Sequence, residues 1–163
     1  MEPRFTIRTR YTEEEFVRFN RTIQFKEGRL WRTMIISNAA LLVMIVTSLV
    51  TGNYLFAIPL IIFMAAVNWY VFKGIDMRAS KMYKNSKMSD QTVFELAFYD
   101  DRYEGATDDG AAAIPYSKLH RIIETPTNYY ILESPMSGTI LQKSKCPDEF
   151  MAFISDIKAK YRL

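Results

Sequence analysis

Hydrophobic and polar positions divide the chain into an apolar middle and two mixed ends. Residues 33–72 hold no charged side chain, and Thr51-Gly52-Asn53 divides them into apolar runs at 33–50 and 54–72. At about 1.5 Å of rise per residue, each run makes a helix of about 26–28 Å, close to the hydrocarbon thickness of a bilayer. A chain of 163 residues has too small a core to bury two such helices on all sides. The pattern therefore predicts a transmembrane hairpin.

In the segment before the hairpin, the spacing of apolar residues changes from that of a strand to that of a helix. Residues 5–11 alternate apolar and polar side chains, which is typical of a short strand. Thr12 and the three glutamates after it predict a helix start, and apolar residues then recur at i, i+3 and i+7. Only Gly28 interrupts the run into the first span, so the helix either continues or bends there. We expect residues 1–32 to form a cytoplasmic strand and an amphipathic helix.

The segment after the hairpin begins with a basic helix at residues 73–87 and then changes to short apolar runs between turn residues. Such runs indicate a small antiparallel sheet or barrel within residues 88–163. The expected strands are 92–99, 102–107, 113–117, 119–124, 129–133 and 139–143, with turns at Asp100-Asp101 and Asp108-Asp109-Gly110. A last helix opens at Pro147, and its apolar stripe should cap the sheet.

The sequence thus predicts an α+β membrane protein in which a two-helix hairpin carries a small antiparallel sheet or barrel. Whether the N-terminal strand joins that sheet is open at this stage, and we favour the arrangement in which it does.

Charge is segregated along the chain. Residues 73–87 carry five Lys or Arg against one Asp, the segment before the hairpin is also basic, and the connecting turn is uncharged. The positive-inside rule then places both termini in the cytoplasm of a two-span membrane protein. Residues 88–163 carry eight Lys or Arg against twelve Asp or Glu, which argues against nucleic-acid binding. The opening residues show no signal peptide.

Polar and aromatic side chains within the hairpin refine this placement. Asn38 and Asn68 should lie at similar depth in an antiparallel hairpin, where they either hydrogen-bond to each other or reach the wet interface separately. Aromatic residues at the ends of the spans are typical of membrane-interface anchors. These anchors are Trp31, Tyr54, Trp69 and Tyr70.

Candidate chemistry is sparse. His120 and Cys146 are too few for a zinc site, and no metal, cofactor or nucleophile–base motif is present. Cys146 lies before a helix start, which could lower its pKa, although a lone cysteine is more often a small buried hydrophobe. We therefore expect a protein that is not an enzyme and that uses no cofactor.

Three segments resemble the bacterial YcxB-like family. They are Tyr116-Ser-Lys-Leu-His-Arg-Ile-Ile-Glu-Thr125, Tyr129-Tyr-Ile-Leu132 and Cys146-Pro-Asp-Glu-Phe150. The order of strands followed by one helix, together with the hairpin, is similar to that family along nearly the whole chain. The resemblance implies a pleckstrin-homology-like (PH-like) cytoplasmic domain and carries no catalytic content.

Two functions fit this pattern. The first is a membrane-anchored binding module that docks a protein partner or its own copies through a strand edge or the groove beside the last helix. The candidate partner surface is Tyr116, Lys118, Arg121, Tyr129 and Tyr130, although the tyrosines could instead fill the core. The second is an accessory subunit of a transport or envelope complex, with the hairpin as the contact.

Lipids are the other expected partners. The basic flanks could contact anionic headgroups, although an ordinary stop-transfer flank explains them too. Headgroup recognition by the sheet domain is disfavoured because the Asp100-Asp101 and Asp108-Asp109 turns are acidic.

Overall fold

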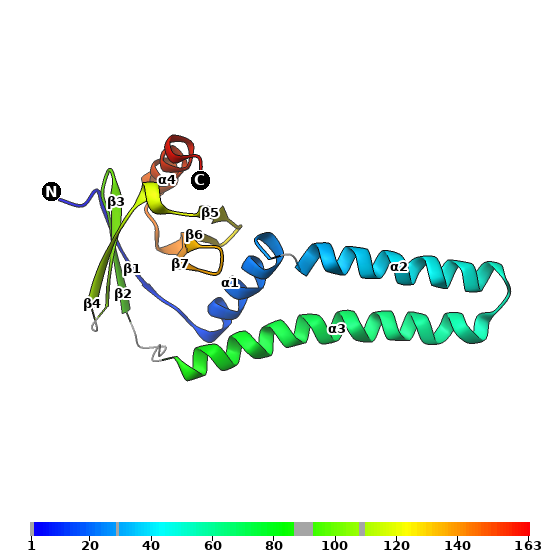
Figure 1. Ribbon diagram of the computed structural model, residues 1–163. Helices are drawn as coiled ribbons and strands as arrows, with labels where there is room; N and C mark the ends of the chain where they lie inside the picture. The colour runs from blue at the N-terminus through cyan, green and yellow to red at the C-terminus, as the bar shows by residue number, and fades with distance from the viewer. Residues whose placement is uncertain (1, 29, 87–92, 108–109) are drawn as a thin grey trace.

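The computed structural model describes residues 2–28, 30–86, 93–107 and 110–163 and shows an α+β chain with a projecting helical hairpin (Figure 1). The described residues form four α-helices and two antiparallel sheets. The helices are α1 (Glu13–Lys26), α2 (Leu30–Val50), α3 (Tyr54–Asn85) and α4 (Asp148–Tyr161). The predicted Asp108-Asp109 turn, Arg29 and Lys87 lie outside the described residues.

The hairpin is formed by α2 and α3, which are both long and apolar enough to cross a membrane. The second span and the basic segment predicted after it are one continuous helix, because nothing between Tyr54 and Asn85 interrupts the helical period. Pro59 is accommodated near the start of α3. Before the hairpin the chain bends, since α1 ends at Lys26 and α2 begins at Leu30. The bend needs glycine at position 28, because a side chain there would lie 2.4 Å from the Gln24 carbonyl oxygen.

The four-stranded sheet has the order β1-β2-β3-β4. Its strands are β1 (Phe5–Arg10), β2 (Val93–Phe98), β3 (Arg102–Thr107) and β4 (Gly110–Pro115). Because β1 pairs with β2 along its whole length, the N-terminal strand joins the C-terminal domain, as we favoured. The hairpin is therefore inserted between two neighbouring strands of one sheet.

The three-stranded sheet has the order β5-β6-β7. Its strands are β5 (Arg121–Glu124), β6 (Asn128–Ser134) and β7 (Ser137–Gln142), and short 3-10 turns at Tyr116–Lys118 and Lys143–Lys145 flank it. The two sheets do not close into a barrel. The last helix begins one residue later than expected, with Pro147 as its N-cap.

Two apolar clusters hold these layers together. One cluster lies between the two sheets and α4 and includes Phe98, Tyr129, Ile131 and Phe150. The other lies on the opposite face of the three-stranded sheet and includes residues of α1, β5, β6 and β7. The three-stranded sheet is consequently covered on both faces, by α4 on one side and α1 on the other (Figure 1). The sequence had indicated only the α4 cover.

Helix α1 also holds the base of the hairpin. Arg21 makes two hydrogen bonds to the Asp76 carboxylate, at 3.1 and 2.5 Å. The Tyr83 hydroxyl donates to the Tyr11 carbonyl at 2.7 Å, and this bond is buried. One helix thus contacts both α3 and the three-stranded sheet, which fixes the hairpin to the β domain.

Candidate functional site

The structure corrects the candidate partner surface. Tyr116, Tyr129 and Tyr130 are each at most 2% exposed, so they fill the core and offer no contact surface. Tyr129 and Tyr130 are neighbours in β6 and point to opposite faces of a sheet that is covered on both. The Tyr116 hydroxyl donates to the Tyr99 carbonyl at 2.9 Å, and burial raises its pKa.

The two cations of that candidate surface do not form a patch. Lys118 is exposed on a 3-10 turn. Arg121 instead pairs with Glu27 at the end of α1, with 2.9 Å between guanidinium nitrogen and carboxylate oxygen. His120 contacts the same carboxylate at 3.1 Å. This cluster joins α1 to β5 and leaves Arg121 engaged within the chain.

A better candidate is a hollow of about 420 Å³ between the outer end of the four-stranded sheet and the β6–β7 turn region. We call it the inter-sheet hollow. Its walls come from β2, β3, β4, β6 and β7, with Tyr11 at one side, and its polar groups belong to Tyr11, Tyr103, Glu133 and Thr139. Small residues of β3, β4 and β7 form much of the rest. Its size lies within the range of ligand and peptide sites.

The polar groups of the inter-sheet hollow are connected to one another. The Tyr103 hydroxyl donates to Glu133 at 2.7 Å and lies 3.2 Å from the Thr139 hydroxyl. Burial raises the pKa of Tyr103 and of Tyr11 above the ordinary value of a phenol, so both remain hydrogen-bond donors at neutral pH and above. Glu133 itself is exposed at the rim, where its carboxylate can accept hydrogen bonds from a partner.

Beside the hollow runs the β4 edge, defined as Gly110–Pro115 at the end of the four-stranded sheet. Its residues Gly-Ala-Ala-Ala-Ile-Pro carry no charge, and the three alanines are exposed. Native proteins usually protect an edge with lysine, proline or a bulge, because its outer backbone groups can pair with another strand. Here Pro115 alone stands at the end of the strand. The contact surface expected from the sequence did not include these alanines, although their uncharged run was a signal for it.

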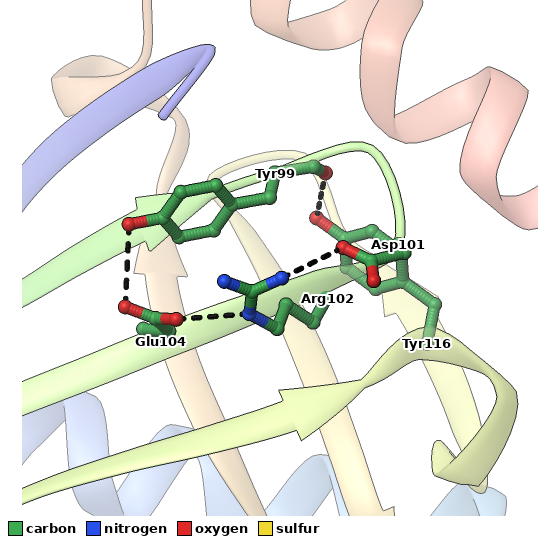
Figure 2. A network of polar contacts seen from close by, with 5 residues as sticks. All are labelled: Tyr99, Asp101, Arg102, Glu104 and Tyr116. Atoms are coloured by element: carbon green, nitrogen blue, oxygen red, sulfur yellow. Dashed lines mark hydrogen bonds and ion pairs between the residues drawn. The ribbon is translucent and has the colours of Figure 1, made fainter. Parts of the chain in front are cut away.

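Figure 2 shows a polar network at the β2–β3 turn, formed by Tyr99, Asp101, Arg102 and Glu104 of that hairpin and by Tyr116 of the 3-10 turn after β4. Arg102 bonds to Glu104 at 2.9 Å and to Asp101 at 3.2 Å, and its guanidinium lies 4.5 Å from the Tyr99 ring centre. The hydrogen bond to Glu104 raises the pKa of Arg102. Because its acids and aromatic neighbour are supplied by the same hairpin, this arginine stabilises the turn and is not free to hold a phosphate.

Cys146 is half-buried and donates to the Gln142 carbonyl at 3.2 Å. Burial raises the pKa of its thiol to about 11, so the possibility of a lowered pKa at the helix start is wrong. Across the parts of the chain that the structure describes, no three His, Cys, Asp or Glu side chains gather to hold a metal.

The two asparagines of the hairpin meet. The Asn38 amide donates to Asn68 Oδ1 at 3.1 Å, and the Asn68 amide donates to Asn38 Oδ1 at 2.8 Å. Each amide also donates to the carbonyl four residues earlier in its own helix. All four amide hydrogens are therefore used within the hairpin, which makes the pair a link between the helices.

The aromatic residues expected at the membrane interface lie on the hairpin surface. Trp31, Tyr54, Trp69 and Tyr70 are between 42% and 70% exposed. The structure does not bring them together, since Tyr54 begins α3 and the others lie near the opposite end of the hairpin.

One comparison with known proteins gives a match. No curated protein and no solved structure matches the chain. The family model described as YcxB-like protein matches residues 98–154, a segment that runs from the end of β2 into α4. This match confirms, over residues 98–154, the resemblance to the YcxB-like family that the sequence showed.

Proposed function

We propose that the protein is a membrane-anchored, cytoplasmic binding module that docks an extended segment of a protein partner, or of its own copy, at the β4 edge. The single observation that carries this proposal is the exposed, uncharged β4 edge beside the inter-sheet hollow. Main-chain pairing at such an edge supplies affinity, and a neighbouring hollow supplies side-chain specificity. Glu133 at the rim favours a partner that presents a donor or a cation there.

Membrane insertion is supported by the exposed surface of the hairpin. Within the most apolar window of each long helix only 6% of the residues are buried, so the helices are not core helices of a soluble domain. Leu55 and Val50 near the connecting turn are 86% and 82% exposed. Basic flanks and an uncharged turn favour an orientation with both termini in the cytoplasm.

A PH-like domain is supported by the order of the elements. Four antiparallel strands, then three, then one helix follow each other once the hairpin is set aside. In this arrangement the first strand precedes the hairpin and the other six follow it. Phosphate recognition by the β2–β3 turn is disfavoured because Arg102 already pairs with Asp101 and Glu104.

A catalytic role is disfavoured on chemical grounds. Burial moves the pKa of the phenols in the inter-sheet hollow, and of the Cys146 thiol, further above neutral pH than their ordinary values. None of these groups is activated as a nucleophile at neutral pH.

Photo-crosslinking in living cells tests the docking proposal. A photoreactive residue at Ala111 or Ala113 should capture one reproducible partner, whereas the same residue at exposed Met151 or Ser155 of α4 should not. Ala113→Lys should weaken capture from Ala111, because a charged edge resists strand pairing. Thr6→Lys on exposed β1 is the matched control. Equal capture from the strand and from α4 would contradict docking at the β4 edge.

The alternative is an accessory subunit whose hairpin is the contact. The observation that favours it is the run of exposed large apolar side chains along α2 and α3. It predicts capture from hairpin positions such as Leu42 and Val46, none from the β4 edge, and loss of function when a foreign hairpin replaces residues 30–85.

A further inference from the structure

One face of α3 carries a hollow of about 330 Å³ where the helix leaves the apolar span. We call it the α3 groove. Its apolar part includes Leu30 and Val71, and its outer part includes Gly74, Arg78 and Lys81. On a helix with 100° per residue, positions 71, 74, 78 and 81 fall on one face. The groove therefore runs along the helix axis.

The α3 groove continues into the apolar span. A second hollow, of about 750 Å³, is lined by α2, α3 and Gln24 of α1, and it shares Leu30 and Val71 with the groove. Half of its ten other lining residues are apolar, and these reach Phe63 within the span. The other five are polar and uncharged: Gln24, Thr33, Ser37, Asn38 and Asn68. The hollows together offer a cationic end followed by a long uncharged end.

Gly74 opens the groove. A side chain at this position would meet no atom within 4 Å, so close packing within the chain does not require glycine there. A glycine inside a helix costs about 1 kcal/mol relative to alanine. The missing side chain leaves space between the apolar residues on one side and the two cations on the other.

The charges distinguish the α3 groove from the opposite side of the same helix. Among the described residues, neither Arg78 nor Lys81 has an ion pair or a side-chain hydrogen bond. The hollow on the other side contains Lys73 but also three carboxylates, from Glu13, Glu14 and Asp76. Those three carboxylates pair with Arg18, Arg21 and Lys84, so the charges of that hollow are engaged within the chain. The two cations of the α3 groove are instead available to an anion.

From these features we infer that the α3 groove binds one acidic phospholipid. Its phosphate lies against Arg78 and Lys81, and an acyl chain follows Val71 into the uncharged hollow. The heights fit, since Gly74 lies about 3 Å beyond the end of the apolar span, within a headgroup layer that is about 5–8 Å thick on each side. The backbone of Arg78 lies about 9 Å beyond the span, and its long side chain reaches back into that layer. Lys81 reaches back toward that layer along its side chain. This inference rests on the membrane insertion proposed above and is independent of docking at the β4 edge.

Native mass spectrometry of the full chain in mild detergent tests the inference. Phosphatidylglycerol and phosphatidylcholine with the same acyl chains are titrated, and glycerol phosphate is added as the soluble headgroup. We expect tighter retention of phosphatidylglycerol, and about a 25-fold loss in the double variant Arg78→Gln/Lys81→Gln, at about fivefold per cation. Gly74→Leu should weaken the binding of both lipids, because the leucine side chain fills the groove.

Matched controls separate the groove from general charge and bulk. Arg32→Gln/Lys73→Gln removes two cations near the same interface, outside the α3 groove, and should change phosphatidylglycerol binding less than twofold. Ala65→Leu adds bulk at an exposed position on another face of α3 and should have no effect. Circular dichroism of every variant verifies that the helices are retained.

Four results would overturn the inference. The first is equal retention of the two lipids, and the second is a loss of phosphatidylglycerol binding in the Arg32→Gln/Lys73→Gln variant as large as in Arg78→Gln/Lys81→Gln. The third is full displacement of phosphatidylglycerol by glycerol phosphate. The fourth is a dimer of the chain without bound lipid that Gly74→Leu dissociates. Alkaline extraction of membranes separates the two proposals. A chain released by alkali refutes membrane insertion itself, whereas a retained chain without lipid preference refutes only the groove.

Discussion

The two sheets of this protein face different surroundings. The three-stranded sheet is covered on both faces, and five consecutive residues of β6 are buried. The four-stranded sheet packs one face on the core and ends in β4, whose first four residues are exposed. The first sheet therefore connects α1 and the hairpin to the core, while the second leaves an edge available. The three-stranded sheet is therefore a structural region, and the four-stranded sheet offers a region suited to binding.

Truncation of a side chain in β6 should give the largest effect. Leu132 is fully buried against α1, so Leu132→Ala should destabilise the chain by about 2–5 kcal/mol. Ile114 of β4 is only half-buried, and Ile114→Ala should cost clearly less. Thermal unfolding of the full chain in mild detergent measures both. Equal losses would contradict the division between a buried sheet and an available edge.

Glycines in the two sheets provide a second contrast. A side chain at Gly138 in β7 would lie 2.3 Å from the Ile131 carbonyl oxygen, whereas one at Gly105 in β3 would make an ordinary 3.5 Å contact with Leu96. Gly138→Ala should therefore destabilise by about 1–3 kcal/mol. Gly105→Ala should stay within about 0.5 kcal/mol of the parent chain. The same unfolding experiment tests this, and a tolerated Gly138→Ala would show that β7 shifts freely.

The base of the hairpin should behave as part of the buried region. Tyr83→Phe removes the buried hydrogen bond to the Tyr11 carbonyl and should cost about 1 kcal/mol. Tyr70→Phe is the control, because Tyr70 is 70% exposed. Hydrogen exchange of α1 amides should rise only in the first variant. No change there would mean that the hairpin base is held by other contacts.

The smallest expected effect concerns Glu27, which joins α1 to β5. Desolvation raises the pKa of its carboxyl, but hydrogen bonds to His120 and Arg121 outweigh it, so the pKa is lowered. A carboxylate with a lower pKa in the folded chain stabilises it above the unfolded value of about 4.3 and loses that effect as the pH falls through the folded pKa. Glu27→Gln should cost about 1 kcal/mol or less at pH 7.

Unfolding temperatures of the parent chain and of Glu27→Gln, measured between pH 7 and pH 3, test the direction of this pKa shift. The difference in unfolding temperature between the parent chain and Glu27→Gln should shrink as the pH falls. A difference that grows toward low pH would reverse the assignment. Arg8→Gln, which breaks an exposed pair with Glu95 in the four-stranded sheet, should have almost no effect.

Local patterns were enough to predict many elements. The alternation in residues 5–11, the glutamates after Thr12 and the two apolar runs each specify an element through neighbouring residues alone. The boundaries of α2 and α3 differed from the prediction where the helix continues through polar residues, because helical geometry does not require an apolar sequence.

The candidate site was predicted poorly, for a physical reason. Aromatic residues suit a contact surface and a core equally well, so Tyr116, Tyr129 and Tyr130 were ambiguous until their neighbours were known. One signal of two-sided burial was present in the sequence. The apolar doublets Ile122-Ile123 and Ile140-Leu141 break the alternation of a sheet with one wet face.

The sequence by itself determined the apolar hairpin, the strand-rich remainder, the last helix and the YcxB-like segment, because each depends on residues close together in the chain. Tertiary structure alone decided that α1 covers the second face of the three-stranded sheet and that β4 stands at an edge. It also decided that Arg78 and Lys81 have no ion pair within the described part of the chain, whereas Arg21 and Lys84 pair with acids. Burial and charge pairing depend on which distant segments meet in space, and no local pattern encodes that.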